Sequence, residues 1–530
     1  MLLETKSSTI LGLGMVIFIT CLIAKLFERS PVPEGIPWIL SKKGFFGRAT
    51  ERFIGVNPIA FIKDGYEKYS KNNKPFVMPS VNEGDEVLLP IKESNTILFA
   101  KETEFSFKAH ILDFFQLKYT SWPLAFAEKY DFYVKLISKD LSETLKTPSV
   151  AASLAEEARA CLSEHWGEDT ENWVQVPLYS FMEKTADRMI NVLAIGPGNS
   201  GDKALLAALT HCSNAIVFGA NVIKAFPAFL HPSPNSFKRV VGPLVGLVNR
   251  YYERVFHARL KPIIEKKIQD QKEASNPEVL KQTLKKKGSL LDLLIQAGMR
   301  SKWPMELTTM WLAYRIFMIN FPGVHTSGVS ATSVLLDILS YSDENLIGLL
   351  RDEMHSISSD GSWTAEDLKK AAVLESAVKE SLRLNGINAV SPTRKVVAPN
   401  GVELGNGIHL PFGTKVGIPQ YALHRDNDLY PSPDQYNPFR FYVPHIPTEE
   451  RRNDLITATS DTYVVFGHGR RQCPGRWIFA HIFKVLTAEM LLKYDIRPMQ
   501  TRPKIHRWGR FQLPPVTTKL TVRRRKDAVV

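Results

Sequence analysis

The chain has 530 residues, of which 44% are hydrophobic and 23% are charged, a composition that excludes a disordered protein and allows a large core. Its formal net charge is +13, but the basic runs at residues 285–287 and 523–526 have no interleaved aromatic residues. We therefore expect solvated loops rather than a nucleic-acid groove. The cysteines lack the paired spacing of a zinc site or a disulfide framework, which fits a reducing compartment. They are Cys21, Cys161, Cys212 and Cys473.

The N-terminal segment predicts a membrane anchor. It is uncharged over the 18 residues from Ser7 to Ala24, and a helix of that length spans ~27 Å, close to the thickness of bilayer hydrocarbon. Lys25 and Arg29 follow, and positive flanks tend to stay cytosolic. We expect a single-pass anchor over residues 1–30, with the rest of the chain, residues 31–530, in the cytosol. A cleavable signal peptide is the alternative, although Leu22 fits the small-residue cleavage pattern near Ala24 poorly.

The body of the chain reads as mostly helical. Residues 133–270 carry helical patterns, with breaks at 196–198 and around the prolines at 227–234, and residues 271–288 have the composition of an exposed linker. Val and Ile alternate with glycines over residues 401–418, which predicts a small sheet. The expected fold class is mostly α with small β-sheets (α+β).

One apolar stretch, Glu306–Leu339, contains Pro-Gly-Val-His-Thr-Ser at residues 322–327. A proline inside a helix lacks one hydrogen bond and clashes with the carbonyl four residues earlier, so we expect the helix to open at Pro322. A threonine in mid-helix usually donates a hydrogen bond to the carbonyl four residues back. For Thr326 this is the purely structural interpretation, without a catalytic role. For His325, a packing role and a proton-relay role are both open.

Two further segments carry charged residues that could form one ion network. Glu380 and Arg383 are three residues apart, so they lie on one helical face and can pair. Surface pairs of this kind are common on helices. Arg440 follows in Asn-Pro-Phe-Arg-Phe and is a third candidate for the same ion network.

The strongest signal is Phe-Gly-His-Gly-Arg-Arg-Gln-Cys-Pro-Gly at residues 466–475. The apolar pattern from Ile478 predicts an amphipathic helix after the loop. Gly475 and this helix supply backbone N–H groups and a helix dipole that favour a thiolate at Cys473. Gly469 permits a positive φ angle in a tight turn, and Arg471 suits a buried anion such as a propionate. Phe466 is expected to pack on the face of a flat macrocycle. The pattern therefore predicts a haem iron held by Cys473, and a thiolate ligand of that kind favours O–O bond cleavage.

With these motifs the chain resembles the cytochrome P-450 haem-thiolate monooxygenases over roughly residues 31 to 515, most closely the microsomal fungal members. The resemblance implies haem b, the Glu380–Arg383–Arg440 network, and a catalytic Thr326 that manages protons beside bound dioxygen. It makes Arg394 a candidate for binding a haem propionate. Because the motifs spread along the chain, the resemblance also implies one large domain over residues 31–530. The sequence departs from the family in four places: Pro322 and His325 replace a small residue and an acid, Phe439 stands where many members carry Glu, and none of the tryptophans at 122, 166 and 173 is followed by Arg four residues later.

The resemblance also implies partners and a location. We expect electrons from an NADPH-dependent flavoprotein reductase, attracted by basic residues near Cys473 (Arg470, Arg476 and Lys484), and a catalytic domain on the cytosolic face of the endoplasmic reticulum membrane. The substrate is expected to be a hydrophobic natural product, terpenoid-like or another fungal secondary metabolite, that is hydroxylated, epoxidised or successively oxidised. Two alternatives stay open: a haem-thiolate isomerase or dehydratase that needs no dioxygen, and a non-catalytic haem-binding membrane protein. Expected lining residues are Asn320, Phe321, Gly323, Val324, residues 387–390, Phe511 and Leu513.

Overall fold

The computed structural model describes residues 32–39, 59–79, 84–121, 134–225, 234–273, 288–343, 345–358, 361, 363–443 and 455–528. The predicted anchor, Ser7–Ala24, lies outside the described residues, as do residues 274–287 of the predicted linker. Among the described residues one helical segment, Lys203–Lys224, is long and apolar enough to cross a membrane, but half of it is buried inside the protein, as in a core helix.

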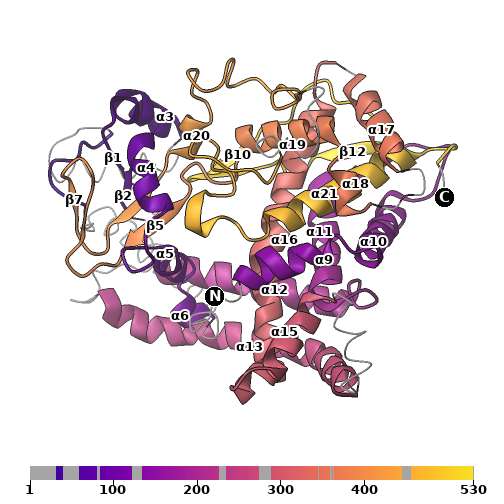
Figure 1. The fold of residues 1–530 in the computed structure, drawn as a ribbon, viewed down its shortest axis with the longest axis horizontal. Helices are drawn as coiled ribbons and strands as arrows, with labels where there is room; N and C mark the ends of the chain where they lie inside the picture. The colour runs from indigo at the N-terminus through magenta and orange to yellow at the C-terminus, as the bar shows by residue number, and fades with distance from the viewer. Residues whose placement is uncertain are drawn as a thin grey trace, which may run out of the picture.

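Most of the described chain is helical (Figure 1). The long helices of the body are α10 (Pro148–Trp166), α11 (Leu178–Ile195), α12 (Lys203–Ala225), α13 (Pro234–Glu273), α15 (Leu290–Met299), α16 (Thr309–Leu339), α17 (Asn345–Ile357), α19 (Ala372–Leu384) and α21 (Arg476–Lys493). The shorter helices are α3 (Ile59–Lys68), η1 (Ser70–Asn72), α4 (Ile91–Leu98), α5 (Phe107–Phe114), α6 (Leu117–Thr120), η2 (Leu136–Leu141), α9 (Ser142–Thr144), η4 (Pro304–Leu307), α18 (Ala365–Leu368), α20 (Gln420–Leu423) and η5 (Gly469–Arg471).

The strands form small sheets, as the glycine-punctuated segments predicted. The largest has the order β1 (Phe76–Met78), β2 (Glu86–Leu88), β8 (Lys415–Gly417), β5 (Thr393–Val396) and β3 (Phe105–Ser106), with only β2 and β8 parallel. A second sheet joins β4 (Val174–Pro177), β12 (Lys519–Arg524) and β9 (Tyr494–Ile496). Two hairpins complete the set: β6 (Val402–Glu403) with β7 (His409–Leu410), and β10 (His506–Trp508) with β11 (Phe511–Leu513). The expectation of a mostly helical chain with small sheets is confirmed.

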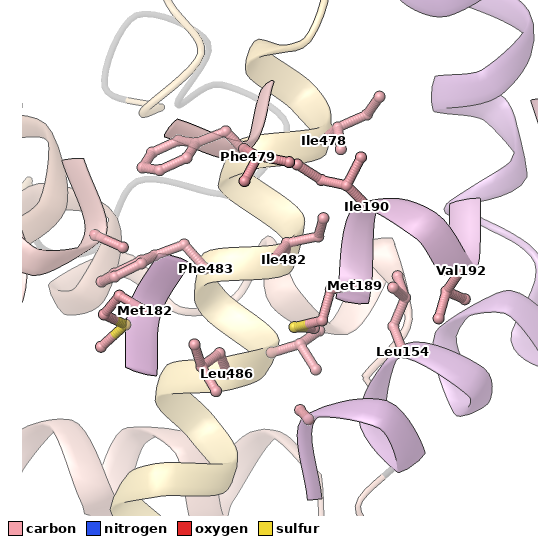
Figure 2. Close-up of a cluster of buried hydrophobic side chains, with 14 of the residues drawn as sticks. Leu154, Met182, Met189, Ile190, Val192, Ile478, Phe479, Ile482, Phe483 and Leu486 are labelled. Carbon is pink, nitrogen blue, oxygen red and sulfur yellow. The ribbon is translucent and has the colours of Figure 1, made fainter. Parts of the chain in front are cut away.

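Two hydrophobic clusters hold these elements together. The larger is built by the helices, and Figure 2 shows α21 passing beside α11, with Phe483 of α21 close to Met182 of α11 and Ile190 of α11 close to Ile478 of α21. The smaller cluster packs α3 and α4 on the five-stranded sheet. Because the apolar faces of both sheet and helices are buried, the loops at their junction are held in fixed positions.

Helix α21 differs from its sequence pattern. We expected an amphipathic helix, but every residue from Ile478 to Leu491 is buried. Its charged residues Lys484 and Glu489 have partners: Lys484 pairs with Glu375 and donates to the carbonyl of Leu368, and Glu489 accepts from Trp363 at 2.9 Å. A fully surrounded helix needs such pairing, because an unpaired buried charge is strongly destabilising. The expectation that Lys484 adds to a basic surface is therefore wrong.

Helix α16 also differs from expectation. It runs without a break from Thr309 to Leu339, with Pro322 inside it, so the predicted opening at Pro322 is wrong. Proline removes only one backbone hydrogen bond, and α16 is packed along its length against α11 and α13. Tertiary packing of this kind outweighs the local cost of a single proline.

Candidate active site

The cysteine loop connects Val464 to α21 through two glycines with positive φ angles, 70° at Gly467 and 74° at Gly469. A Cβ atom at Gly469 would collide with the carbonyl oxygen of Leu98, at the end of α4, so the position requires glycine for space as well as conformation. The loop is closed by the Cys473 N–H, which donates to the Phe466 carbonyl at 2.7 Å. The backbone therefore fixes where the Cys473 side chain begins.

The Cys473 thiol has accessible surface, yet so many protein atoms surround it that desolvation raises its pKa. A thiol that faces an enclosed space has accessible surface and is at the same time surrounded by protein atoms. Backbone N–H groups of Gly475 and Arg476 and the Arg476 charge lower the pKa, but they offset only part of the effect of burial. Burial by itself therefore favours the neutral thiol, and a bound metal cation would favour the thiolate.

Glu380, Arg383 and Arg440 lie together as their order in the sequence predicted. The fully buried Glu380 carboxylate accepts from Arg383 Nε and Nη2 at 2.8 Å each and from Arg440 Nε at 2.9 Å. Arg383 also donates to the carbonyl of His424, whose Nε2 accepts from the Val464 N–H at 3.1 Å. The network is thus joined by hydrogen bonds to the segment that enters the cysteine loop.

The two arginines expected at propionates occupy different settings. Arg394, on β5, is 1% exposed, stacks on the Phe107 ring at 5.3 Å and donates to the Thr393 carbonyl at 2.9 Å. Arg471 is half-buried and donates from Nε to Glu102 Oε2 at 3.0 Å. Phe466 packs against Phe479 of α21 with ring centroids 6.1 Å apart.

Thr326 lies on an accessible face of α16, together with Pro322. Its hydroxyl donates to the Pro322 carbonyl at 2.6 Å, which is the local backbone hydrogen bond expected of a mid-helix threonine. That bond uses the hydroxyl hydrogen and leaves the oxygen lone pairs as acceptors. The geometry therefore permits Thr326 to accept a hydrogen bond from a water or another donor on the accessible side of the helix.

His325 points to a different neighbour. Its Nδ1 lies 2.8 Å from Glu183 Oε1 on α11, and the Tyr179 hydroxyl donates to the same oxygen at 3.1 Å. The contact with His325 lowers the pKa of Glu183. One turn further along α11, burial raises the pKa of Asp187 to about 7. An acidic group therefore lies beside the residue that precedes Thr326, although on another helix, and no sequence pattern indicated it.

The residues expected to line a substrate site are only partly brought together. Phe321 contacts Phe115 with centroids 5.0 Å apart, and Phe511 contacts Phe114 at 6.1 Å. Residues 387–390 join β11 through Ala389 N–H to Arg510 O and Gln512 N–H to Ile387 O, each 2.8 Å. These contacts give an aromatic wall with members from α5, α16 and β11.

Two expected lining residues face elsewhere. Asn320 is buried and donates to Asn191 of α11 at 3.3 Å. A Cβ atom on Gly323 would contact Ile190 of α11 at 3.2 Å, so both positions turn toward α11. Phe114, the last residue of α5, and Phe115, directly after it, were not among the expected lining residues, although adjacent aromatic residues at the end of a short helix were a visible signal.

A basic hollow lies beside the cysteine loop. It has a volume of about 640 Å³ and is lined by Ala100, Lys101, Glu102, Thr103, Val134, Lys135, Ser138, Arg470 and Arg471. Arg470 is exposed, whereas Arg476 is turned inward and donates to the Cys473 carbonyl at 2.8 Å. The predicted basic surface therefore consists of Arg470 together with lysines from other segments, which the sequence did not place there.

Comparison with known proteins is consistent with this site. The family model described as Cytochrome P450 matches residues 202–522. Similar proteins include the cytochrome P450 monooxygenase polB of Polytolypa hystricis, 28% identical over 94% of each chain. Another is the cytochrome P450 monooxygenase lnaC of Aspergillus flavus, 26% identical over 98% of this chain and 99% of the relative. A third, the cytochrome P450 monooxygenase htyF of Aspergillus rugulosus, is 28% identical over 87% of this chain and 68% of the relative.

Proposed function

Since this chain belongs to the cytochrome P450 family, we propose that it oxidises a hydrophobic fungal secondary metabolite, terpenoid-like or of a related class, with dioxygen and electrons that a flavoprotein reductase takes from NADPH. The observation that carries the proposal is the cysteine loop. Its glycines, its closing hydrogen bond and its link to Glu380 hold one accessible cysteine within the protein.

The family implies a haem held by a cysteine thiolate, and the residues present fit haem b. Cys473 is accessible although surrounded, and a Cβ atom on Gly475 would meet no atom within 4 Å, so the space beside the loop is open. Arg394 and Arg471 would hold the propionates by charge-assisted hydrogen bonds. When bound, the haem supplies the redox chemistry that activates dioxygen, and its thiolate ligand favours O–O cleavage.

Thr326 is the residue we assign to proton handling. Its hydroxyl hydrogen is committed to the Pro322 carbonyl, so its oxygen would hold a water in place as an acceptor, and that water would carry the proton. His325 precedes Thr326 in the sequence, and Glu183 of α11 contacts His325. They are candidates for supplying that proton from the α11 side.

An aromatic wall supports a hydrophobic substrate. The rings of Phe114, Phe115, Phe321 and Phe511 have centroids 4.7–6.1 Å apart, and such surfaces bind apolar ligands that carry few polar groups. The substrate itself is identified here only by this chemistry.

A membrane location is supported by the surface of α12 and α13 as well as by the anchor sequence. Phe218, Leu244 and Tyr251 are 72%, 61% and 63% exposed. Between residues 234 and 264 the only acidic residue, Glu253, is buried, whereas Arg250 and several other arginines are exposed. An apolar strip with basic flanks is typical of a surface that rests on an anionic bilayer. We propose single-pass attachment to the endoplasmic reticulum membrane with a cytosolic catalytic domain.

The test is the carbon monoxide difference spectrum of the reduced protein expressed in membranes. A strongly red-shifted Soret band is expected for the wild type, its loss for Cys473→Ser, and its retention for the matched control Cys212→Ser. A wild type without the shifted band would refute the proposal. No observation favours the two alternatives. Turnover without NADPH would establish the isomerase, and stable haem without any NADPH consumption would establish the non-catalytic protein.

A further inference from the structure

Glu102 connects two parts of the site that are far apart in the sequence. It lies in the turn between α4 and β3, and its two carboxylate oxygens accept from different partners. Oε1 accepts from the Ser106 hydroxyl at 2.6 Å and from the Lys108 N–H at 2.8 Å. Oε2 accepts from Arg471 Nε at 3.0 Å. One side chain thus joins the start of α5 to the cysteine loop.

The Oε1 contacts fix the first turn of α5. Ser106 caps this helix by accepting from the Ala109 N–H at 2.8 Å, and Glu102 holds the Ser106 hydroxyl in that position. A carboxylate at a helix N-terminus also interacts favourably with the helix dipole. At its other end α5 leads into Phe114 and Phe115, which contact Phe511 and Phe321. The orientation of α5 therefore sets the aromatic wall.

The Oε2 contact fixes Arg471, two residues before Cys473. The same stretch of loop is already in close contact with α4, because Gly469 has no room for a Cβ atom beside the Leu98 carbonyl. The second candidate propionate arginine, Arg394, stacks on Phe107, the first residue of α5. Arg394 therefore contacts the first turn of α5 directly, and Arg471 is connected to that turn through Glu102.

We infer that Glu102 is a positioning residue that couples the haem-binding cysteine loop to the substrate wall on α5. The inference rests on the proposed function, because it assigns Arg471 to the haem. Glu102 is 30% exposed and Arg471 20% at the side chain, so the contact is partly desolvated and worth more than an exposed ion pair. A role limited to capping α5 would involve Ser106 but not the loop.

The test uses the full-length haem protein and two nitrogenous probes, imidazole and 4-phenylimidazole. Both ligate haem iron through nitrogen, but only the second carries a ring large enough to reach an aromatic wall. For Glu102→Gln we expect the dissociation constant of 4-phenylimidazole to rise about tenfold, the factor given by the loss of one charge-assisted hydrogen bond. The constant for imidazole should change less than about twofold. Glu104→Gln is the matched control, since its side chain makes no hydrogen bond or ion pair with any residue that the structure describes.

Three results would overturn the inference: equal weakening of both probes by Glu102→Gln, weakening of neither, or an equal effect of Glu104→Gln. A wild type without a thiolate spectrum would refute the proposed function instead. Amide hydrogen exchange of the protein tests the coupling between α5 and the cysteine loop independently of the two probes. Glu102→Gln should speed exchange both in α5 and in residues 469–473, whereas Ser106→Ala should speed it in α5 alone. Exchange that changes in only one segment for Glu102→Gln would contradict the coupling.

Discussion

Replacing Glu380 by Gln should destabilise the protein strongly, because this carboxylate is fully buried between two guanidinium groups. It accepts two hydrogen bonds from Arg383, one from Arg440 and one from the Asn437 N–H at 3.3 Å. The glutamine has nearly the same shape, but it has no charge and turns an N–H₂ group toward an arginine.

The size of the destabilisation follows from the buried arginine charges that are left without a carboxylate partner. Arg383 is 0% exposed at its side chain, so its charge cannot recover the lost interaction from water. Removing one partner of a buried ion pair costs about 3–5 kcal/mol. A loss of about 3 kcal/mol raises the unfolded fraction by roughly two orders of magnitude. The matched control is Glu366→Gln, whose pair with Lys369 at 2.8 Å is 63% and 44% exposed and is worth about 0–1 kcal/mol.

The assay is urea denaturation of the reduced, carbon monoxide-bound protein, followed by the thiolate Soret band and by far-ultraviolet circular dichroism. For Glu380→Gln the midpoint should fall for both signals, and the thiolate band should be lost at the lower urea concentration. This order is expected because the network is joined through His424 to Val464, directly before the cysteine loop. A loss of less than about 1 kcal/mol, or a loss equal to that of Glu366→Gln, would refute the reasoning.

Three further outcomes are expected. Thr326→Ala should retain the thiolate spectrum but raise the hydrogen peroxide released per NADPH consumed, because the oxygen that would hold a water is gone. Gly469→Ala should lower the thermal midpoint and the haem content, because a Cβ atom collides with the Leu98 carbonyl and φ is 74°. Asp187→Asn should flatten the pH dependence of stability. Burial raises the pKa of this acid from 3.8 to about 7, so the folded state binds more protons and wild-type stability falls as pH rises between about 4 and 7.

Each of these outcomes has a control. Thr332→Ala removes a hydroxyl with the same backbone bond, to Gly328 at 2.7 Å, from the buried face of the same helix, and its coupling should stay normal. For Gly469, the comparison is Gly348→Ala, where an added Cβ atom meets nothing within 4 Å, and an equal loss of haem there would contradict the steric argument. For Asp187, a pH profile that keeps its slope after the substitution would show that another group titrates in that range.

The sequence alone predicted the parts of the site whose chemistry depends on local order. The cysteine loop, with glycines at 467 and 469, requires those backbone angles wherever it occurs. The spacing of Glu380 and Arg383 on one helical turn made their pairing possible before any fold was known. Hydrophobic patterns likewise indicated a mostly helical chain with small sheets.

Other features depended on which elements came to lie side by side. Lys484 was expected at the surface, but the neighbours of α21 enclose it and Glu375 pairs with it. Pro322 was expected to open α16, but the packing of α11 and α13 keeps the helix continuous. The partners of Arg471 and His325, Glu102 and Glu183, lie 369 and 142 residues away in the chain. No local pattern can report a contact between residues so far apart.

One physical cause separates the features that the sequence predicted from those that it did not. Backbone conformation and helical spacing are set by neighbours in the chain, so the sequence by itself determined the cysteine loop, the ion-pair helix and the family they indicate. Side-chain environment is set by packing between elements, which depends on all of them at once. Only the tertiary structure therefore decided which faces of α16 point to α11 or away from it, which aromatic residues form the wall, and that one carboxylate, Glu102, joins that wall to the cysteine loop.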